Sequence, residues 1–146
     1  MEKQVIQSVG FRNISEGGKV TGFQLKIRLP YYRGVFLSQV KVGSIVVDGE
    51  EITKDNILWR LNGSDYTWQE MLKSGNVHWN PLELVTLIVD KPGGLKQGYH
   101  DLKYSYACTH SYMPPMLEEL MQPDKEETVY LVEFGHIHNT RRLIIV

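Results

Sequence analysis

The 146-residue sequence contains little cysteine, no long apolar run and no excess of positive charge. Its single cysteine, Cys108, excludes a disulfide within the chain and is typical of a reducing compartment, which predicts a cytoplasmic location. No apolar stretch approaches the ~20 residues that a membrane helix needs. The first residues, Met1 to Gln4, lead into a strand-like segment, so we expect no secretory signal. We therefore expect no membrane partner.

The charge balance argues against nucleic acid as a partner. The formal net charge is -1, so Lys and Arg provide no surplus to neutralise phosphates. With 42% hydrophobic and 23% charged residues, the composition is that of an ordinary folded protein. The length is near the commonest size of one domain, which predicts a single β-sandwich domain over residues 1–146.

Strand patterns dominate the chain. Residues Phe23 to Leu29 alternate strictly between apolar and polar side chains, as in a strand with one buried face. Asp48-Gly49 is a favoured two-residue hairpin turn. Further strands, each bounded by turn residues, are expected at Val35 to Val47, in a return strand through Ile52, and at Ile57 to Leu61, Leu82 to Val89, Tyr99 to Thr109, Val129 to Phe134 and Arg142 to Val146.

Only two short helices are predicted. Thr67 and Glu70 have the spacing of a capping box, and a second helix is expected from Met116 to Met121. Neither is long enough to connect parallel strands, so the sheets should be antiparallel. About eight or nine strands with one or two short helices predict an all-β fold, either an antiparallel β-sandwich, which we prefer, or a barrel.

His136 and His138 are the sharpest candidates for a metal site, because residues two apart share one face of a strand. A third ligand at a recognisable spacing is missing, and His100 or His110 could approach only through the fold. We prefer the alternative interpretation, a polar turn before the last strand. Cys108 is expected to be a buried structural thiol, because a strand would hold His110 beyond hydrogen-bond distance.

The aromatic residues could fill the core or form stacking platforms for a sugar or a flavonoid. Tyr104 and Tyr106, for example, share one face of their predicted strand and could line either a sheet interior or a groove. Other residues are expected in loops and are of types that are enriched at protein interfaces: Tyr31, Tyr32, Arg33, Tyr112 and Met113. No complete set of catalytic residues is recognisable.

Several short motifs follow one another along the chain. They are Gly22-Phe23-Gln24-Leu25-Lys26-Ile27-Arg28-Leu29-Pro30-Tyr31-Tyr32-Arg33-Gly34, Leu37-Ser38, Val47-Asp48-Gly49-Glu50, Tyr66-Thr67-Trp68-Gln69-Glu70-Met71, Lys91-Pro92-Gly93-Gly94-Leu95 and Ser111-Tyr112-Met113-Pro114. In this order they resemble the β subunit of C-glycoside deglycosidases. Each motif is short, so the resemblance rests on their order and on the total length, and it spans nearly the whole chain.

The resemblance implies a β-sandwich subunit that joins a larger α subunit with a sugar-isomerase-like TIM barrel. That partner would hold a divalent metal, expected to be manganese, and the catalytic residues. The heteromer would be a lyase that cleaves the carbon–carbon bond of 3-oxo-C-glucosides of flavonoids or isoflavonoids by metal-assisted β-elimination. No catalytic residue is carried over onto this chain. The loop residues Tyr31, Tyr32, Arg33, Tyr112 and Met113 are predicted to dock the α subunit.

Two other classes of protein remain open. A free-standing carbohydrate-binding β-sandwich module would explain exposed aromatic residues, and it predicts a stable monomer that binds sugar unaided. A cupin-like metalloenzyme would use His136 and His138, and it predicts a stoichiometric metal on the isolated chain. Co-expression with a neighbouring isomerase-like gene product would separate these classes.

Overall fold

The structure is a computed structural model that describes residues 5–29, 34–108 and 136–146, with only the backbone described for residues 136–138. The predicted strand at Val129 to Phe134 and the predicted helix at Met116 to Met121 therefore lie outside the described residues. No helix within the described part of the chain is long and apolar enough to cross a membrane.

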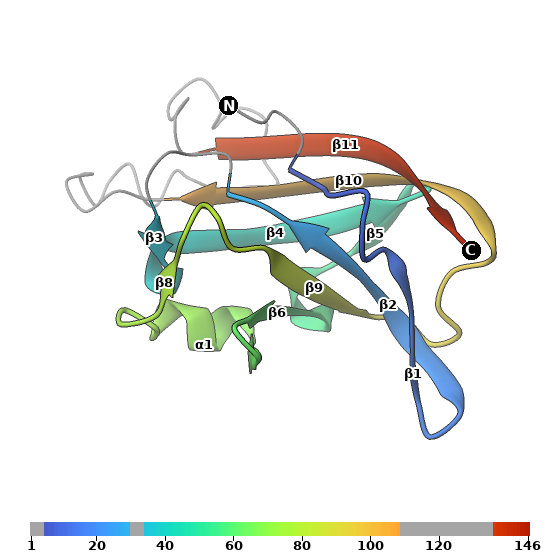
Figure 1. The fold of residues 1–146 in the computed structure, drawn as a ribbon, viewed down its shortest axis with the longest axis horizontal. Coiled ribbons are helices and arrows are strands. Elements are labelled where there is room, and N and C mark those ends of the chain that lie inside the picture. Colours follow the sequence, from blue (N-terminus) through green and yellow to red (C-terminus); the bar gives the residue numbers. More distant parts are fainter. Residues whose placement is uncertain (1–4, 30–33, 109–135) are drawn as a thin grey trace.

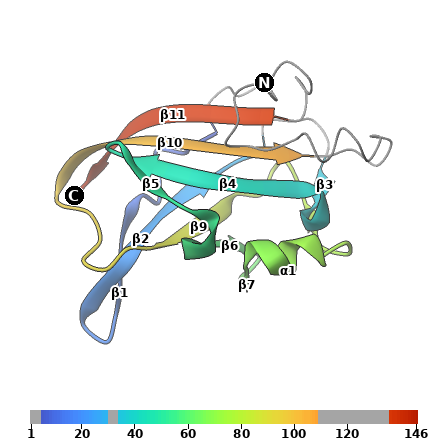
Figure 2. The same ribbon diagram turned by 180° about the vertical axis from the view of Figure 1, so that it is seen from behind.

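The described residues form antiparallel sheets, which confirms the prediction of an all-β fold (Figure 1). The five-stranded sheet has the strand order β1 (Arg12–Glu16), β2 (Lys19–Ile27), β9 (Val85–Asp90), β6 (Ile57–Leu61) and β7 (Ser64–Tyr66). The four-stranded sheet has the order β11 (His136–Ile145), β10 (Gly98–Cys108), β4 (Val40–Val47) and β5 (Glu50–Ile52). A small ribbon pairs β3 (Val35–Phe36) with β8 (His78–Trp79). Figure 2 shows the same layers from behind.

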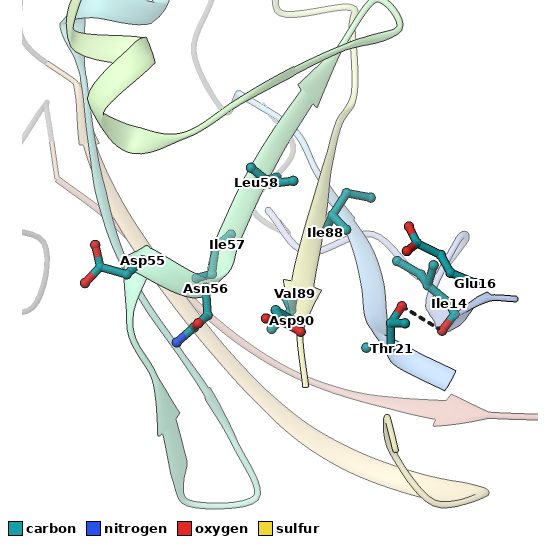
Figure 3. A pocket seen from close by; sticks show the side chains of 11 residues that line it. Ile14, Glu16, Thr21, Asp55, Asn56, Ile57, Leu58, Ile88, Val89 and Asp90 are labelled. Carbon is teal, nitrogen blue, oxygen red and sulfur yellow. Dashed lines mark hydrogen bonds between the residues drawn. The ribbon is translucent and has the colours of Figure 1, made fainter. Parts of the chain in front are cut away.

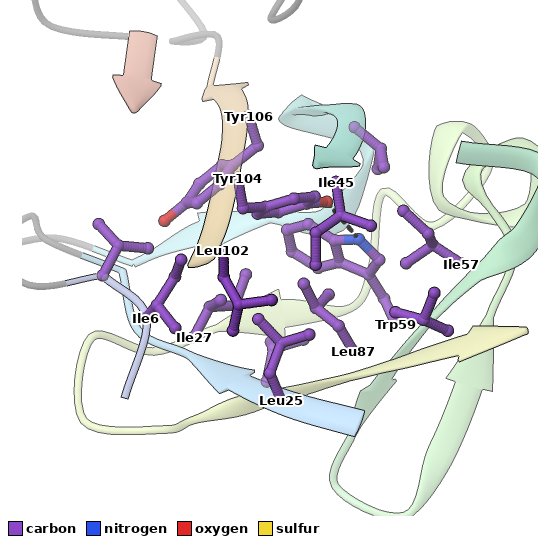
Figure 4. Close-up of a cluster of buried hydrophobic side chains, with 14 of the residues drawn as sticks. Ile6, Leu25, Ile27, Ile45, Ile57, Trp59, Leu87, Leu102, Tyr104 and Tyr106 are labelled. Carbon is purple, nitrogen blue, oxygen red and sulfur yellow. Dashed lines mark hydrogen bonds between the residues drawn. The ribbon is translucent and has the colours of Figure 1, made fainter. Parts of the chain in front are cut away.

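The core lies between the two larger sheets and is rich in aromatic side chains (Figure 4). Trp59 of β6 and Tyr104 of β10 meet across this core, where the indole Nε1 donates to the tyrosine hydroxyl over 3.2 Å. Trp79 and Tyr106 complete the cluster, and the rings of Trp59 and Trp79 meet edge to face with centroids 5.4 Å apart. These four residues are at most 1% exposed, so the interpretation of them as stacking platforms is wrong. Burial of such large apolar rings stabilises the sandwich.

One hairpin and one helix form where local sequence predicts them. Asp48 and Gly49 have φ angles of 50° and 85°, as a two-residue turn between paired strands requires. Helix α1 (Trp68–Leu72) begins after Thr67, whose hydroxyl accepts from the Glu70 N–H while the Glu70 carboxylate accepts from the Thr67 N–H. The predicted capping box is therefore confirmed.

Other boundaries differ from the prediction. The stretch from Val35 to Val47 is not one strand, because a 3₁₀ turn at Leu37–Gln39 separates β3 from β4. Short strands β1, β7 and β8 carry little alternation of their own: β1 and β7 form by pairing with the adjacent strands β2 and β6, and β8 by pairing with the distant β3. The last strand begins at His136, six residues before Arg142, because its whole length pairs with β10. The preferred interpretation of residues 135–139 as a polar turn is therefore wrong for the backbone from His136 onward.

Candidate functional site

The segments with the predicted interface residues leave the described structure at one end of the sandwich. The hydroxyl of Tyr106, near the end of β10, donates to the backbone carbonyl oxygen of Arg28 just after β2, over 3.0 Å. Along the chain, residues 30–33 come soon after β2, and residues 109–135 come directly after β10. The fold thus brings the starting points of both segments together. The predicted residues themselves, Tyr31, Tyr32, Arg33, Tyr112 and Met113, lie outside the described residues.

The ribbon of β3 and β8 borders this end. Gly34 passes so close to His78 that a side chain at Gly34 would overlap the imidazole. The ring of Phe36 packs edge on against the same imidazole with ring centroids 5.2 Å apart, and Phe36 is 43% exposed. Nearby, the Nε of Arg28 is buried with no hydrogen-bond partner among the residues that the structure describes. An exposed aromatic ring is of a residue type that is enriched at protein interfaces.

The opposite end of β10 contains a polar cluster around His100. The Nδ1 of His100 lies 2.6 Å from Oδ2 of Asp48, and its Nε2 lies 2.6 Å from the carbonyl oxygen of Lys96. Burial opposes a charge on the imidazole, but these two acceptors outweigh it and raise the pKa of His100. The hydrogen bond from His100, with a second from the Asp101 N–H, lowers the pKa of Asp48. Because both ring nitrogens are engaged, His100 has no free nitrogen for a metal or a proton transfer.

The four-stranded sheet keeps His100 away from the predicted histidine pair. In the register of β10 and β11, His138 lies opposite Ser105 and His136 opposite Ala107. Five residues separate His100 from Ser105 along β10, which corresponds to ~16 Å of strand. His100 is therefore not the third ligand. His110 and the side chains of His136 and His138 lie outside the described residues, so a metal site there stays a prediction. Among the residues that are described, no group of three or more His, Cys, Asp or Glu could hold a metal ion.

Cys108 is buried with 5% of its surface exposed. Burial raises the pKa of its thiol to about 12, so the thiol stays protonated at neutral pH and is a poor nucleophile. This confirms the prediction of a buried structural thiol. The sequence reasoning missed the contact between His100 and Asp48, because Asp48 was recognised only as a turn residue and its partner is 52 positions away.

The fold defines an all-β protein built from antiparallel sheets. Comparison of the sequence with known proteins gives the particular family. The profile of the family "C-glycoside deglycosidase beta subunit" matches residues 1–112. The chain therefore belongs to the C-glycoside deglycosidase beta subunit family, as its motif order suggested.

Three individual relatives support the same family assignment. The chain is 58% identical over 147 aligned residues to the C-glycoside deglycosidase beta subunit of Eubacterium cellulosolvens, with 100% of both chains covered. It is 25% identical over 79 residues to the beta subunit of Arthrobacter globiformis, covering 54% of this chain and 60% of that one. It is 26% identical over 66 residues to the beta subunit of Microbacterium trichothecenolyticum, covering 45% and 50%. Membership in a family of beta subunits implies a partner subunit and a place in an enzyme complex.

Proposed function

We propose that this chain is the non-catalytic beta subunit of a heteromeric lyase that cleaves the carbon–carbon bond of 3-oxo-C-glucosides of flavonoids or isoflavonoids. The observation that carries the proposal is the likeness to a beta subunit of this kind over the full length of both chains. The single cysteine supports a cytoplasmic location for the complex.

The proposed reaction is a β-elimination. A ketone at C3 of the sugar acidifies the proton on C2, and a base of the partner subunit takes that proton. The electron pair of the C2–H bond forms the C1–C2 double bond. The bond from C1 to the aglycone breaks, its electron pair goes to the phenolic ring, and that ring accepts a proton as it leaves.

The metal of this reaction, which we propose to be manganese, belongs to the partner subunit, a sugar-isomerase-like TIM barrel. The described residues of this chain do not fit such an ion, since none of them gather into a group of three or more ligands. A bound divalent cation would stabilise negative charge that develops on the sugar oxygens.

The proposed role of this chain is to bind the partner subunit through Tyr31, Tyr32 and Arg33, with Tyr112 and Met113 as further contacts. Two observations support this role. The strand ends that lead into both segments are neighbours, and the exposed ring of Phe36 borders them. Tyrosine and arginine are also the residue types that most often dominate the binding energy of interfaces.

The first test is to co-express the chain with the neighbouring isomerase-like gene product and to separate the proteins by size-exclusion chromatography. We expect one complex that cleaves a 3-oxo-C-glucoside, while the isolated beta chain is inactive. Cleavage by the isolated chain would overturn the proposal. A stoichiometric metal on the isolated chain would instead support a site at His136 and His138, and sugar binding by an isolated monomer would support a carbohydrate-binding module.

The second test changes one residue of the proposed interface. We expect Tyr32→Ala to weaken the complex by about tenfold or more, as loss of a central interface tyrosine does. Tyr99→Ala is the matched control, because Tyr99 is 71% exposed and lies at the far end of β10. Equal affinities of the two variants, measured by calorimetry or interferometry, would contradict the role of Tyr32.

A further inference from the structure

A groove with a volume of about 350 Å³ opens on the outer face of the five-stranded sheet, away from the core (Figure 3). Its apolar lining comes from the outward side chains of Ile14, Leu58 and Ile88, on β1, β6 and β9. Ile57 and Val89 also belong to its lining, although their side chains are part of the buried core. The volume is within the range of sites that receive a ligand or a side chain.

Gly22 of β2 is one of the residues that line the groove. Gly22 lies between Ile14 on one neighbouring strand and Asp90 on the other in the register of the sheet. A side chain on Gly22 would overlap the carbonyl oxygen of Val89, so the backbones approach closely at this point.

The groove also concentrates negative charge. Three carboxylates, those of Glu16, Asp55 and Asp90, belong to its lining, which contains no Lys or Arg. The Asp55 carboxylate accepts from the indole N–H of Trp68 over 2.8 Å, and the Nζ of Lys54 lies 4.2 Å from the centre of the same indole, so Asp55 already has a cation close by. Within the described part of the chain, Glu16 and Asp90 take part in no salt bridge.

Apolar walls and carboxylates together select one kind of side chain. The hydrocarbon stems of lysine and arginine pack against apolar surface, while their charged ends seek water or an acidic partner. Such a stem could lie along Ile14 and Ile88 with its cationic end near Asp90 or Glu16. Sugars would be held less well, because no aromatic ring lines the groove.

We propose that this groove receives a lysine or arginine side chain of the partner subunit and so forms a second contact between the two subunits. That the side chain comes from the partner subunit rests on the proposed function. That it is cationic with a long hydrocarbon stem rests on the residues that line the groove. Arg28, directly after β2, is six residues from Gly22, which corresponds to ~20 Å of extended chain. The groove is thus distinct from the end of the sandwich that leads to Tyr32.

The test measures the affinity of the complex with the co-expressed isomerase-like subunit at low and high salt. We expect Asp90→Lys to weaken the complex about tenfold at low salt and less at high salt, because salt screens interface charges. Glu51→Lys is the matched control: Glu51 is an equally exposed strand carboxylate on the other sheet, and the same charge change there should alter affinity by no more than about twofold. Ile88→Thr keeps a β-branched side chain but removes apolar contact, and should weaken the complex at both salt concentrations.

Several results would overturn the inference. If the wild-type chain binds the partner and Asp90→Lys binds as tightly as Glu51→Lys, the groove is not a contact, although the proposed function stands. If the isolated chain is a dimer that Asp90→Lys converts to a monomer, a second copy fills the groove. If the wild-type chain forms no complex with the partner, both proposals fail. Equal melting temperatures of all variants show that the differences come from binding and not from folding.

Discussion

The contact between His100 and Asp48 should make the stability of the protein depend on pH. The imidazole is 11% exposed and holds the turn at Asp48 to the carbonyl oxygen of Lys96, so it joins two loops at one end of the sandwich. A neutral imidazole has only one N–H and can serve only one of these two acceptors. The protonated form serves both, and it is the form that the folded structure stabilises.

The direction of the effect follows from the two pKa shifts. The pKa of His100 is raised above its ordinary 6.5, so its contribution is complete below pH 6.5 and is lost as the pH rises through the raised value. The pKa of Asp48 is lowered from its ordinary 3.8, so its contribution is present above pH 3.8 and is lost as the pH falls through the lowered value. The contact should therefore be strongest between these two ordinary values.

The size of the effect is limited by solvent. A hydrogen bond to a charged group contributes about 1.5–3 kcal/mol when it is well buried. The carboxylate of Asp48 is 49% exposed, so solvent screening lowers the free energy that the contact contributes. The contribution should approach that of an ion pair on the protein surface. We expect the free energy of unfolding to fall by about 1 kcal/mol as the pH rises from 6 to 9.

The assay is urea unfolding of the wild type and two variants at pH 6 and pH 9. His100→Gln removes the titrating group, and Asp48→Asn removes the charge while keeping a residue that tolerates the positive φ of this turn. Both variants should be less stable than the wild type at pH 6 and should lose most of the difference at pH 9. Parallel curves of stability against pH for wild type and His100→Gln would refute the reasoning.

Two further predictions concern the sheets. Gly22→Ala places a methyl group on the carbonyl oxygen of Val89 and should cost about 1–3 kcal/mol or more in unfolding free energy. Gly75→Ala, where the nearest neighbouring atom is 3.7 Å away, should cost less than half as much in the same urea titration, and equal costs would contradict the close approach of β2 and β9. Tyr104→Phe leaves the indole N–H of Trp59 without its acceptor and should cost about 1–3 kcal/mol by thermal or urea unfolding. A neutral effect would mean that water or another group replaces the hydroxyl.

Local sequence was sufficient where an element depends on residues within a few positions of one another. The turn at Asp48-Gly49 and the capping box of Thr67 and Glu70 form from their own residue types, and both were predicted. The alternation from Phe23 to Leu29 likewise indicates a strand with a buried face. The order of motifs along the chain was also sufficient to recognise the family.

The candidate contacts could be predicted only in part. The loop residues near Tyr32 were chosen by composition, and the sequence alone could not show that Arg28, just after β2, and Tyr106, near the end of β10, are neighbours. The groove was not predicted at all, because it depends on register. Ile14, Gly22 and Asp90 become neighbours only when three strands align.

The sequence by itself determined that the chain is an antiparallel all-β protein of a particular family, because strand alternation, turn residues and motif order are properties of short segments. The tertiary structure decided which aromatic residues are buried, since Trp59 and Tyr104 reach each other only across two sheets. It also decided that β11 begins as early as His136 and that His100 meets Asp48. The physical reason is that pairing between distant strands supplies hydrogen bonds and burial that no local pattern records.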